Sequence, residues 1–204
     1  MPERELFELW LASEAEIREI VPGDNMNNSS LSRNFADFML QHLIRGYSPS
    51  LLRKNEHGKP YIKDLPFSYN LSHCEDLYAI LVTSFDYCGV DIQSVKSLVK
   101  YDDALRSVMT DREYGILKEK GNPGDFFQLW SLKEAYVKAL GGSIWYGRDF
   151  ETETAPGNFS DTWFKREKLF FYSTEVKKEV FLSLAVPALP ETADFLKFLS
   201  KDFS

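Results

Sequence analysis

Apolar side chains recur along this chain at two spacings, and each spacing predicts one kind of element. Residues 67–73 alternate between apolar and polar side chains, as in a strand with one buried face. Residues 77–84 are almost continuously apolar, as in a strand that is buried on both faces. Residues 88–93 follow after a short connection, so we expect the second and third strands to form a hairpin.

Helical spacing of apolar residues predicts three main helices. We expect them from Ser29 or Ser30 to Gly46, from Leu98 to Lys120 with a break in the middle, and from a cap at Asp125 to Leu140. In the second of these regions, Thr110 and Glu113 form a capping-box pattern. The remaining segments predict a strand or short apolar segment ending near Leu11, a helix over 13–20, strands over 169–174 and 180–186, and an amphipathic tail over 192–199.

These elements fall into two similar groups that meet near Asp86. A helix followed by strands precedes this point, and strands that flank helices follow it. Such an arrangement predicts a mixed α+β fold. We therefore divide the chain into an N-terminal half, residues 1–86, and a C-terminal half, residues 87–204.

Composition and charge narrow the class of protein. A chain of 204 residues is long enough for one domain or two small fused lobes. Its net charge of −7 disfavours binding to nucleic acid, which depends on neutralising phosphates. No apolar run approaches the ~20 residues that span a membrane. Cys74 and Cys88 form no C-x-x-C pair, and the N-terminus carries no secretory signal, so we expect a soluble, cytoplasmic protein.

Two short segments carry ionisable groups among apolar neighbours. In the first, strand alternation puts Asp91 and Gln93 on one face. In the second, helical spacing puts Glu134 and Lys138 on one stripe. Taken singly, Asp91 is a turn or cap residue, and the Glu134–Lys138 pair is a surface ion pair worth about 0.2–0.5 kcal/mol.

Taken together, these side chains have the chemistry of a metal and phosphate site. Asp91, Gln93 and Glu134 offer hard oxygen ligands, which suit Mg²⁺. Mg²⁺ usually shares its ligand shell with the phosphates of a substrate. Four further residues are available for phosphate contacts: Arg33, Lys59, Ser72 and His73.

The same segments carry a family resemblance. Gly89-Val-Asp-Ile-Gln93, followed about forty residues later by Trp130-Ser-Leu-Lys-Glu-Ala-Tyr-Val-Lys138, resembles the paired signature of the 4′-phosphopantetheinyl transferase superfamily. Gly58-Lys59-Pro60 and Asn70-Leu-Ser-His73 resemble two further motifs of its larger, surfactin-synthetase-type branch. The four matches follow the family's order and extend roughly over residues 33–142.

This resemblance implies both a fold and a reaction. Members of this size are single chains of two α+β halves related by a pseudo-two-fold axis, with coenzyme A bound in the cleft between the halves. The implied reaction transfers 4′-phosphopantetheine from coenzyme A to a serine of an apo acyl or peptidyl carrier protein, depends on Mg²⁺ and releases 3′,5′-ADP. Carriers of fatty-acid, polyketide and nonribosomal-peptide biosynthesis all stay open. Two halves in one chain predict a monomer.

The resemblance also implies roles for the candidate residues of the N-terminal half. Residues 1–86 are expected to hold the nucleotide side of coenzyme A. Lys59 is expected to contact the nucleotide 3′-phosphate, and Ser72 and His73 the phosphate chain. Arg33 matches the basic residue that opens the family's N-terminal nucleotide-binding helix.

The catalytic roles fall in the C-terminal half, residues 87–204. By motif position, Asp91 and Glu134 are expected to hold Mg²⁺, and Gln93 lies where a third acidic ligand is common. Glu134 is also the candidate base for the serine proton. Lys138 is expected to stabilise charge on the transferring phosphoryl group or to assist proton transfer.

Two departures from the family pattern and two rival functions stay open. Gln93 is neutral, which predicts weaker magnesium affinity, and residues 22–32 lack the Lys/Arg-rich run that many relatives use around the adenosine phosphates. One rival is a degenerate coenzyme A- or nucleotide-binding protein, which has no need of Asp91, Glu134 and Lys138. The other is a magnesium-dependent nuclease, in which the final Glu and Lys commonly lie two apart on a strand.

Four basic residues are candidates for contact with a carrier protein: Lys96, Lys100, Arg106 and Arg112. Acidic residues are interleaved with them. The four therefore form either a docking patch for an acidic carrier protein or a plain solvated face.

Overall fold

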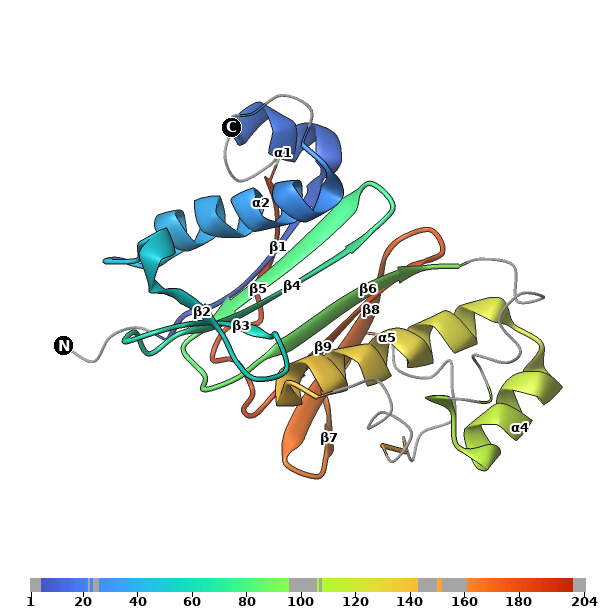
Figure 1. The fold of residues 1–204 in the computed structure, drawn as a ribbon. Helices are drawn as coiled ribbons and strands as arrows, with labels where there is room; N and C mark the ends of the chain where they lie inside the picture. Colours follow the sequence, from blue (N-terminus) through green and yellow to red (C-terminus); the bar gives the residue numbers. More distant parts are fainter. Residues whose placement is uncertain are drawn as a thin grey trace. The chain divides into compact units, whose positions relative to one another are not determined.

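The computed structural model describes residues 5–21, 23, 26–95, 106, 108–142, 150–151 and 161–199 (Figure 1). The chain divides into two compact units. The first consists of Met1–Cys88 together with Pro190–Ser204, and the second of Gly89–Leu189. Each unit contains helices and strands, so the fold is mixed α+β, as predicted.

A four-stranded sheet with the order β10-β1-β5-β4 forms the framework of the first unit. Its strands are β1 (Phe7–Ser13), β4 (Ser68–Cys74), β5 (Leu77–Thr83) and β10 (Leu196–Phe198). β1 pairs antiparallel with β5 and parallel with β10. The division expected from the sequence assigned residues 190–204 to the C-terminal half. Of these residues, Leu196–Phe198 pair with β1, a long-range contact that leaves no local signal in the sequence.

Helices and a small hairpin complete the first unit. They are α1 (Glu14–Ile20), α2 (Asn28–Leu43), the 3₁₀ helix η1 (Pro49–Leu51), β2 (Leu52–Lys54) and β3 (Pro60–Ile62). The buried face of α2 packs against the sheet in one apolar core, in which Phe35 and Met39 of α2 join Tyr78 of β5. Asn27 caps α2 by accepting from the backbone nitrogen of Ser30, so the helix begins slightly earlier than predicted.

The second unit is built on the sheet β6-β9-β8-β7, in which every neighbouring pair is antiparallel. Its strands are β6 (Gly89–Ser94), β7 (Phe164–Arg166), β8 (Leu169–Lys177) and β9 (Val180–Val186). Among the described residues, its helices with defined bounds are α4 (Asp111–Lys120) and α5 (Pro123–Leu140). α5 packs on one face of this sheet, mainly against β6 and β9 (Figure 1). This packing positions the helix signature over the strand signature.

The N- and C-terminal ends of α4 and α5 can be compared with the predicted caps. Thr110 and Glu113 form the predicted capping box at the start of α4. The predicted cap of α5 was wrong, because Asn122 occupies that position and Asp125 accepts a hydrogen bond of 2.7 Å from the Asn122 amide. Gly141 ends α5 in the left-handed conformation, as expected of a glycine stop.

The predicted hairpin between residues 77–84 and 88–93 is also wrong. β5 lies between β1 and β4, so both of its edges are already paired. β6 pairs instead with β9, in the other four-stranded sheet. A short connection is therefore not enough to form a hairpin when neither edge of the first strand is open.

The sequence predicted no membrane-spanning helix. Within the described segments, no helix is both long enough and apolar enough to cross a bilayer. The first part of the helical region predicted after Leu98 lies outside the described residues.

Candidate active site

β6 carries two of the predicted metal ligands. Asp91 is 2% exposed, and the Nε2 atom of Gln93 donates to its Oδ2 atom at 2.8 Å. The two side chains therefore lie on one face, as strand alternation predicts. Val90 and Ile92 are both 0% exposed, so β6 is covered on both faces and the Asp91 carboxylate is largely shielded from solvent.

Gly89, at the start of β6, allows α5 to lie close to this strand. A Cβ atom here would lie 2.0 Å from the carbonyl oxygen of Ala135 and 2.6 Å from the backbone nitrogen of Ala139. Any side chain would collide with the backbone of α5. Glycine at this position is thus what allows the helix to approach Asp91.

α5 brings Lys138 to the same carboxylate. The Nζ atom of Lys138 lies 2.5 Å from Oδ1 of Asp91, and the two side chains are 28% and 3% exposed. Both oxygens of Asp91 thus accept hydrogen bonds, one from Lys138 and one from Gln93. Glu134 and Lys138 stand on a helix, unlike the strand-borne Glu and Lys expected for the rival nuclease.

Glu134 lies in the field of these charges. Burial raises the pKa of its carboxyl group above the ordinary value, and the negative charge of Asp91 raises it further. The ammonium group of Lys138 and a hydrogen bond from the Trp130 indole lower the pKa in part. Asp91 and Glu134 are therefore close enough to repel each other, which favours a cation beside them.

The four remaining candidates lie in the first unit, two of them on β4. Ser72 and His73 are neighbours on this strand, so their side chains leave it on opposite faces. Ser72 is 6% exposed, whereas His73 is exposed and its ring stacks on Tyr78, with centroids 5.2 Å apart. β4 is the edge strand of its four-stranded sheet.

Lys59 lies in the loop between β2 and β3. The Asn55 side chain accepts from the backbone nitrogens of His57, at 3.0 Å, and Lys59, at 2.8 Å. Gly58 has φ +81°, which an L side chain rarely adopts. The Lys59 ammonium group donates to the carbonyl oxygen of Cys88 at 3.3 Å, and burial lowers its pKa. A partly dehydrated cation of this kind attracts an anion more strongly than one in bulk water.

Arg33 is exposed on α2 and lines a groove of about 720 Å³ in the first unit. Arg53 and Lys54 of β2 line the same groove, together with one acidic residue and apolar side chains of α2, β2 and β4. Among the described residues, neither Lys59 nor His73 lines it. The groove suits an anionic ligand with an apolar part.

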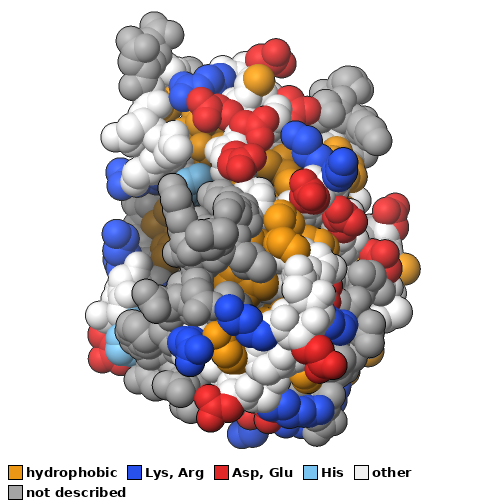
Figure 2. All heavy atoms as spheres, turned by 90° about the vertical axis from the view of Figure 1, so that its right-hand side faces the viewer, with side chains coloured by type: hydrophobic (Ala, Val, Ile, Leu, Met, Phe, Trp, Pro, Cys, Tyr) orange, Lys and Arg blue, Asp and Glu red, His pale blue; other side chains and the backbone are white. Residues whose placement is uncertain are grey.

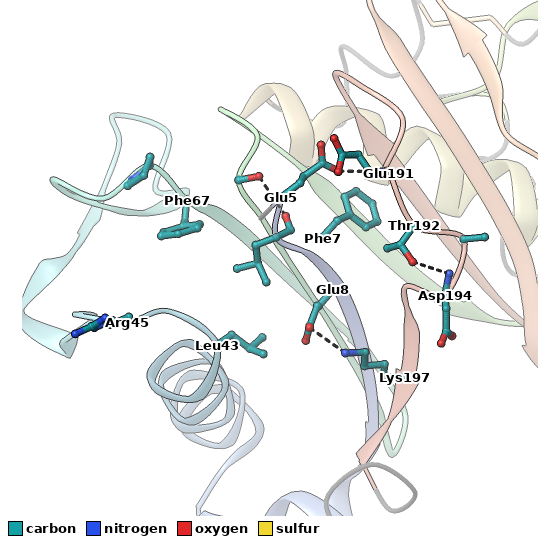
Figure 3. Close-up of a pocket in the computed structure, with 14 residues that line it drawn as sticks. Glu5, Phe7, Glu8, Leu43, Arg45, Phe67, Glu191, Thr192, Asp194 and Lys197 are labelled. Atoms are coloured by element: carbon teal, nitrogen blue, oxygen red, sulfur yellow. Dashed lines mark hydrogen bonds and ion pairs between the residues drawn. The ribbon is translucent and has the colours of Figure 1, made fainter. Parts of the chain in front are cut away.

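A larger hollow in the first unit contains none of the predicted residues (Figure 3). Its volume is about 1030 Å³, and Phe7 is among the residues that line it. Lys197 and Glu8 form an ion pair of 2.9 Å, and the backbone nitrogen of Glu191 donates to Glu5 at 3.1 Å (Figure 3). These contacts hold the C-terminal segment against β1. The hollow is thus explained by the packing of this segment, without the need for any role in binding.

The basic residues considered for carrier docking are only partly described. Lys96 and Lys100 lie outside the described residues. Arg106 lies over an aromatic ring of α4, and Arg112 pairs with Glu151 at 3.5 Å. On the face that Figure 2 displays, described acidic and basic side chains are interspersed. A carrier-docking role for these residues stays a prediction.

Comparison with known proteins identifies the family of the second unit. Residues 87–189, just over half of the chain, match the family model described as ACPS, 4′-phosphopantetheinyl transferase superfamily. This chain belongs to that superfamily. The match includes all four candidates of the second unit: Asp91, Gln93, Glu134 and Lys138.

Curated relatives agree with this assignment. The chain is 31% identical over 99 residues to 4′-phosphopantetheinyl transferase gsp of Aneurinibacillus migulanus, a match that covers 47% of this chain and 40% of that protein. It is 33% identical over 114 residues to a phosphopantetheinyl transferase of Thraustochytrium sp., with 47% and 39% covered. It is 30% identical over 95 residues to 4′-phosphopantetheinyl transferase AcpT of Escherichia coli (strain K12), with 44% and 48% covered. The chain thus spans less than half the length of these relatives.

The superfamily commonly uses magnesium, and the side chains of this member fit that ion. Among the described residues, no group of three His, Cys, Asp or Glu side chains is arranged for a metal, and the candidate set here has two carboxylates and one amide. Mg²⁺ is usually bound by one or two carboxylates, with water and substrate phosphates as further ligands. The repulsion between Asp91 and Glu134 is what a divalent cation relieves.

The helix signature of this superfamily member contains a residue that sequence reasoning missed. Lys133 is 0% exposed, pairs with Glu113 of α4 at 2.9 Å and donates to the carbonyl oxygen of Phe150 at 2.6 Å. It lies four residues after Leu129 and four before Val137, both of which are buried. This spacing was the available signal that Lys133 lies on the buried stripe of α5.

Proposed function

We propose that this superfamily member transfers the 4′-phosphopantetheine group of coenzyme A to a serine of an apo acyl or peptidyl carrier protein. The observation that carries the proposal is the ion pair of 2.5 Å between Asp91 and Lys138, with Glu134 within electrostatic range of both, in the region that matches the family. A protein that only binds a nucleotide has no need of two carboxylates and an ammonium group in this arrangement.

Asp91, Glu134 and Gln93 are the proposed magnesium ligands. When bound, Mg²⁺ would neutralise negative charge on the diphosphate of coenzyme A. Gln93 uses its NH₂ group for Asp91, which leaves its carbonyl oxygen as the atom available to a cation.

The proposed reaction is a displacement at phosphorus. The hydroxyl oxygen of the carrier serine bonds to the β-phosphorus, which carries pantetheine, and the bond from that phosphorus to the bridging oxygen breaks. The electron pair of the broken bond stays on the leaving 3′,5′-ADP. The serine proton passes to the carboxylate of Glu134. Lys138, oriented by its ion pair with Asp91, offsets negative charge on the transferring group.

In the first unit, we propose that four residues contact coenzyme A. Lys59 pairs with the 3′-phosphate, and Ser72 and His73 contact the phosphate chain along the edge strand β4. Arg33 contributes from the groove beside α2. The dehydrated ammonium group of Lys59 and the basic lining of the groove support this assignment.

The two units are also the proposed related halves of the fold. Each has a four-stranded sheet and a long helix that packs with it, α2 in the first unit and α5 in the second. Under this proposal the first unit serves the nucleotide, and the second serves the metal and the chemistry.

Intact-mass analysis of apo carrier proteins tests the proposal. Apo carriers from fatty-acid, polyketide and nonribosomal-peptide systems are each incubated with the full chain, coenzyme A and Mg²⁺. We expect one carrier class to gain one phosphopantetheine, and the gain to be lost on adding EDTA. Glu134→Ala should abolish the gain, whereas Glu119→Ala, an exposed glutamate of α4, should not.

Three outcomes would count against the proposal. Near-normal transfer by Glu134→Ala contradicts the assigned site. No gain on any carrier, with coenzyme A binding intact, supports the degenerate binding protein instead. Failure to bind coenzyme A contradicts both functions.

A further inference from the structure

A row of buried polar side chains crosses the sheet of the second unit beneath α5. Ser173 of β8 and Ser183 of β9 are directly paired across their strands, and Ser183 is in turn paired with Asp91 of β6. Directly paired residues of antiparallel strands lie on the same face. Ser173 and Ser183 are each 0% exposed, and the Ser183 hydroxyl donates to Ser173 at 3.1 Å.

α5 presents a matching polar stripe to this row. The Gln128 amide donates to the Ser173 hydroxyl at 3.2 Å, and the Ser131 and Ser183 hydroxyls share a hydrogen bond of 2.6 Å. Ser131 donates its own proton to the carbonyl oxygen of Gln128 at 2.8 Å, so the Ser183 hydroxyl is the donor toward both Ser131 and Ser173. Gln128 and Ser131 are 2% and 0% exposed, so these hydrogen bonds are formed away from water.

The contact between Lys138 and Asp91 continues the same series. From the start to the end of α5, Gln128 meets Ser173, Ser131 meets Ser183, and Lys138 meets Asp91. The helix therefore makes one polar contact with each of the three neighbouring strands β8, β9 and β6. The contact at the candidate active site is the last of the three.

Hydrogen bonds fix a helix on a sheet more sharply than apolar packing does. Apolar contacts are non-directional and allow small sliding or rotation of the helix. A displaced helix would lose two buried hydrogen bonds at the same time, the one between Ser131 and Ser183 and the one from Gln128 to Ser173. The row thus favours one position of α5 on the sheet.

We propose that Ser131 and Ser183 are positioning residues, which set the register of α5 on the sheet so that Lys138 contacts Asp91. The kinetic part of this inference rests on the proposed transferase function, and its structural part does not. Neither serine belongs to the proposed catalytic or ligand-binding groups.

Three variants test the proposal: Ser131→Ala, Ser183→Ala and the double variant. Each single change leaves a buried partner hydroxyl with one of its two hydrogen bonds, to Gln128 for Ser131 and to Ser173 for Ser183, so we expect the melting temperature to fall. The double variant removes both hydroxyls, and Ser173 keeps Gln128 as a donor, so we expect the melting temperature to recover. We expect kcat to fall about tenfold or more in all three variants and not to recover in the double variant, with KM for coenzyme A unchanged.

Thr174→Ala is the matched control. Thr174 is 8% exposed, and it follows Ser173 on β8, so its side chain lies on the other face of the sheet. We expect this variant to lose stability without losing kcat.

A crystal structure of the double variant provides a readout that does not depend on activity. We expect the 2.5 Å contact between Lys138 Nζ and Asp91 Oδ1 to lengthen beyond hydrogen-bond distance. The proposal is overturned if this contact is unchanged, if kcat follows the melting temperature through the three variants, or if Thr174→Ala loses as much kcat as they do. Should the wild-type chain transfer nothing, the proposed function fails, and the crystal structure alone decides the positioning role.

Discussion

The Nζ atom of Lys138 lies 2.5 Å from Oδ1 of Asp91, which joins the last residue of the helix signature to the central residue of the strand signature. The two residues are 47 positions apart in the chain. Gly89 makes the approach of the helix possible, because no side chain fits between β6 and α5 at that point. The two signatures are therefore parts of one site within the second unit.

Glu134→Gln is expected to lower transfer by about 10²-fold or more and to stabilise the metal-free protein at neutral pH. Burial and Asp91 raise the pKa of Glu134, so the folded state holds this proton more tightly than the unfolded chain does. Folded-state stability therefore falls as the pH rises from the ordinary value of 4.5 through the higher folded pKa, and an amide escapes this loss. Melting temperatures of both proteins in EDTA, from about pH 4 to about pH 8, measure the effect. A stability difference that does not grow with pH would contradict it.

Gln93→Glu is expected to destabilise the metal-free protein and to tighten magnesium binding. The change replaces a hydrogen bond of 2.8 Å to Asp91 with repulsion between two carboxylates, which a divalent cation relieves. Melting temperatures in EDTA and in a magnesium titration check both effects, with Gln41→Glu on the exposed face of α2 as the control. Identical magnesium titrations of the wild-type protein and Gln93→Glu would place Gln93 away from the metal.

Gly89→Ala is expected to lower the free energy of unfolding by about 3 kcal/mol or more. The added methyl group would lie 2.0 Å from the carbonyl oxygen of Ala135, so β6 and α5 have to separate. Gly115→Ala is the control, because its added methyl group meets nothing within 4 Å on α4. This second change should stabilise the protein by about 0.5–1 kcal/mol through helix propensity. Urea unfolding measures both, and equal effects would disprove the close approach.

Lys133→Ala and Glu113→Ala are each expected to cost about 3–5 kcal/mol of unfolding free energy, because each leaves a buried charge without its partner. The combined change Lys133→Met with Glu113→Leu should recover most of this loss, since it removes both charges and keeps their volume. Lys120→Ala breaks the more exposed pair with Asp125 and should cost about 0–1 kcal/mol. Urea unfolding separates these cases. A cost for Lys133→Ala as small as that for Lys120→Ala would show that the buried pair adds little.

Local signals were enough to predict several elements of the fold. The Thr110–Glu113 capping box is made within one turn, so its residues alone determine it. The strand expected over residues 180–186 is β9, Val180–Val186, because charged residues precede its apolar run and Pro187 follows it. The partner of each strand was not predictable in this way. β6 pairs with β9 rather than β5, and this choice depends on which strand edges the rest of the chain leaves open.

In the candidate site, too, local sequence predicted some features, and others depended on contacts between distant segments. Alternation alone predicted that Asp91 and Gln93 share a face. Helical spacing alone described Glu134 and Lys138 as a surface pair, and only the combination with the family resemblance suggested that they meet Asp91. Lys133 was missed because a lysine is usually solvated, and its burial depends on Glu113 from another helix.

The parallel pairing of β1 with β10 sets an order of events during synthesis. Gly89–Leu189 leave the ribosome before Leu196–Phe198 do, so all four strands of the second sheet are available while one edge of β1 is still unpaired. The second unit can therefore complete its sheet first, although its sequence is inserted within that of the first unit. Until β10 arrives, the nascent chain exposes an open strand edge, which is the kind of surface that chaperones protect from aggregation.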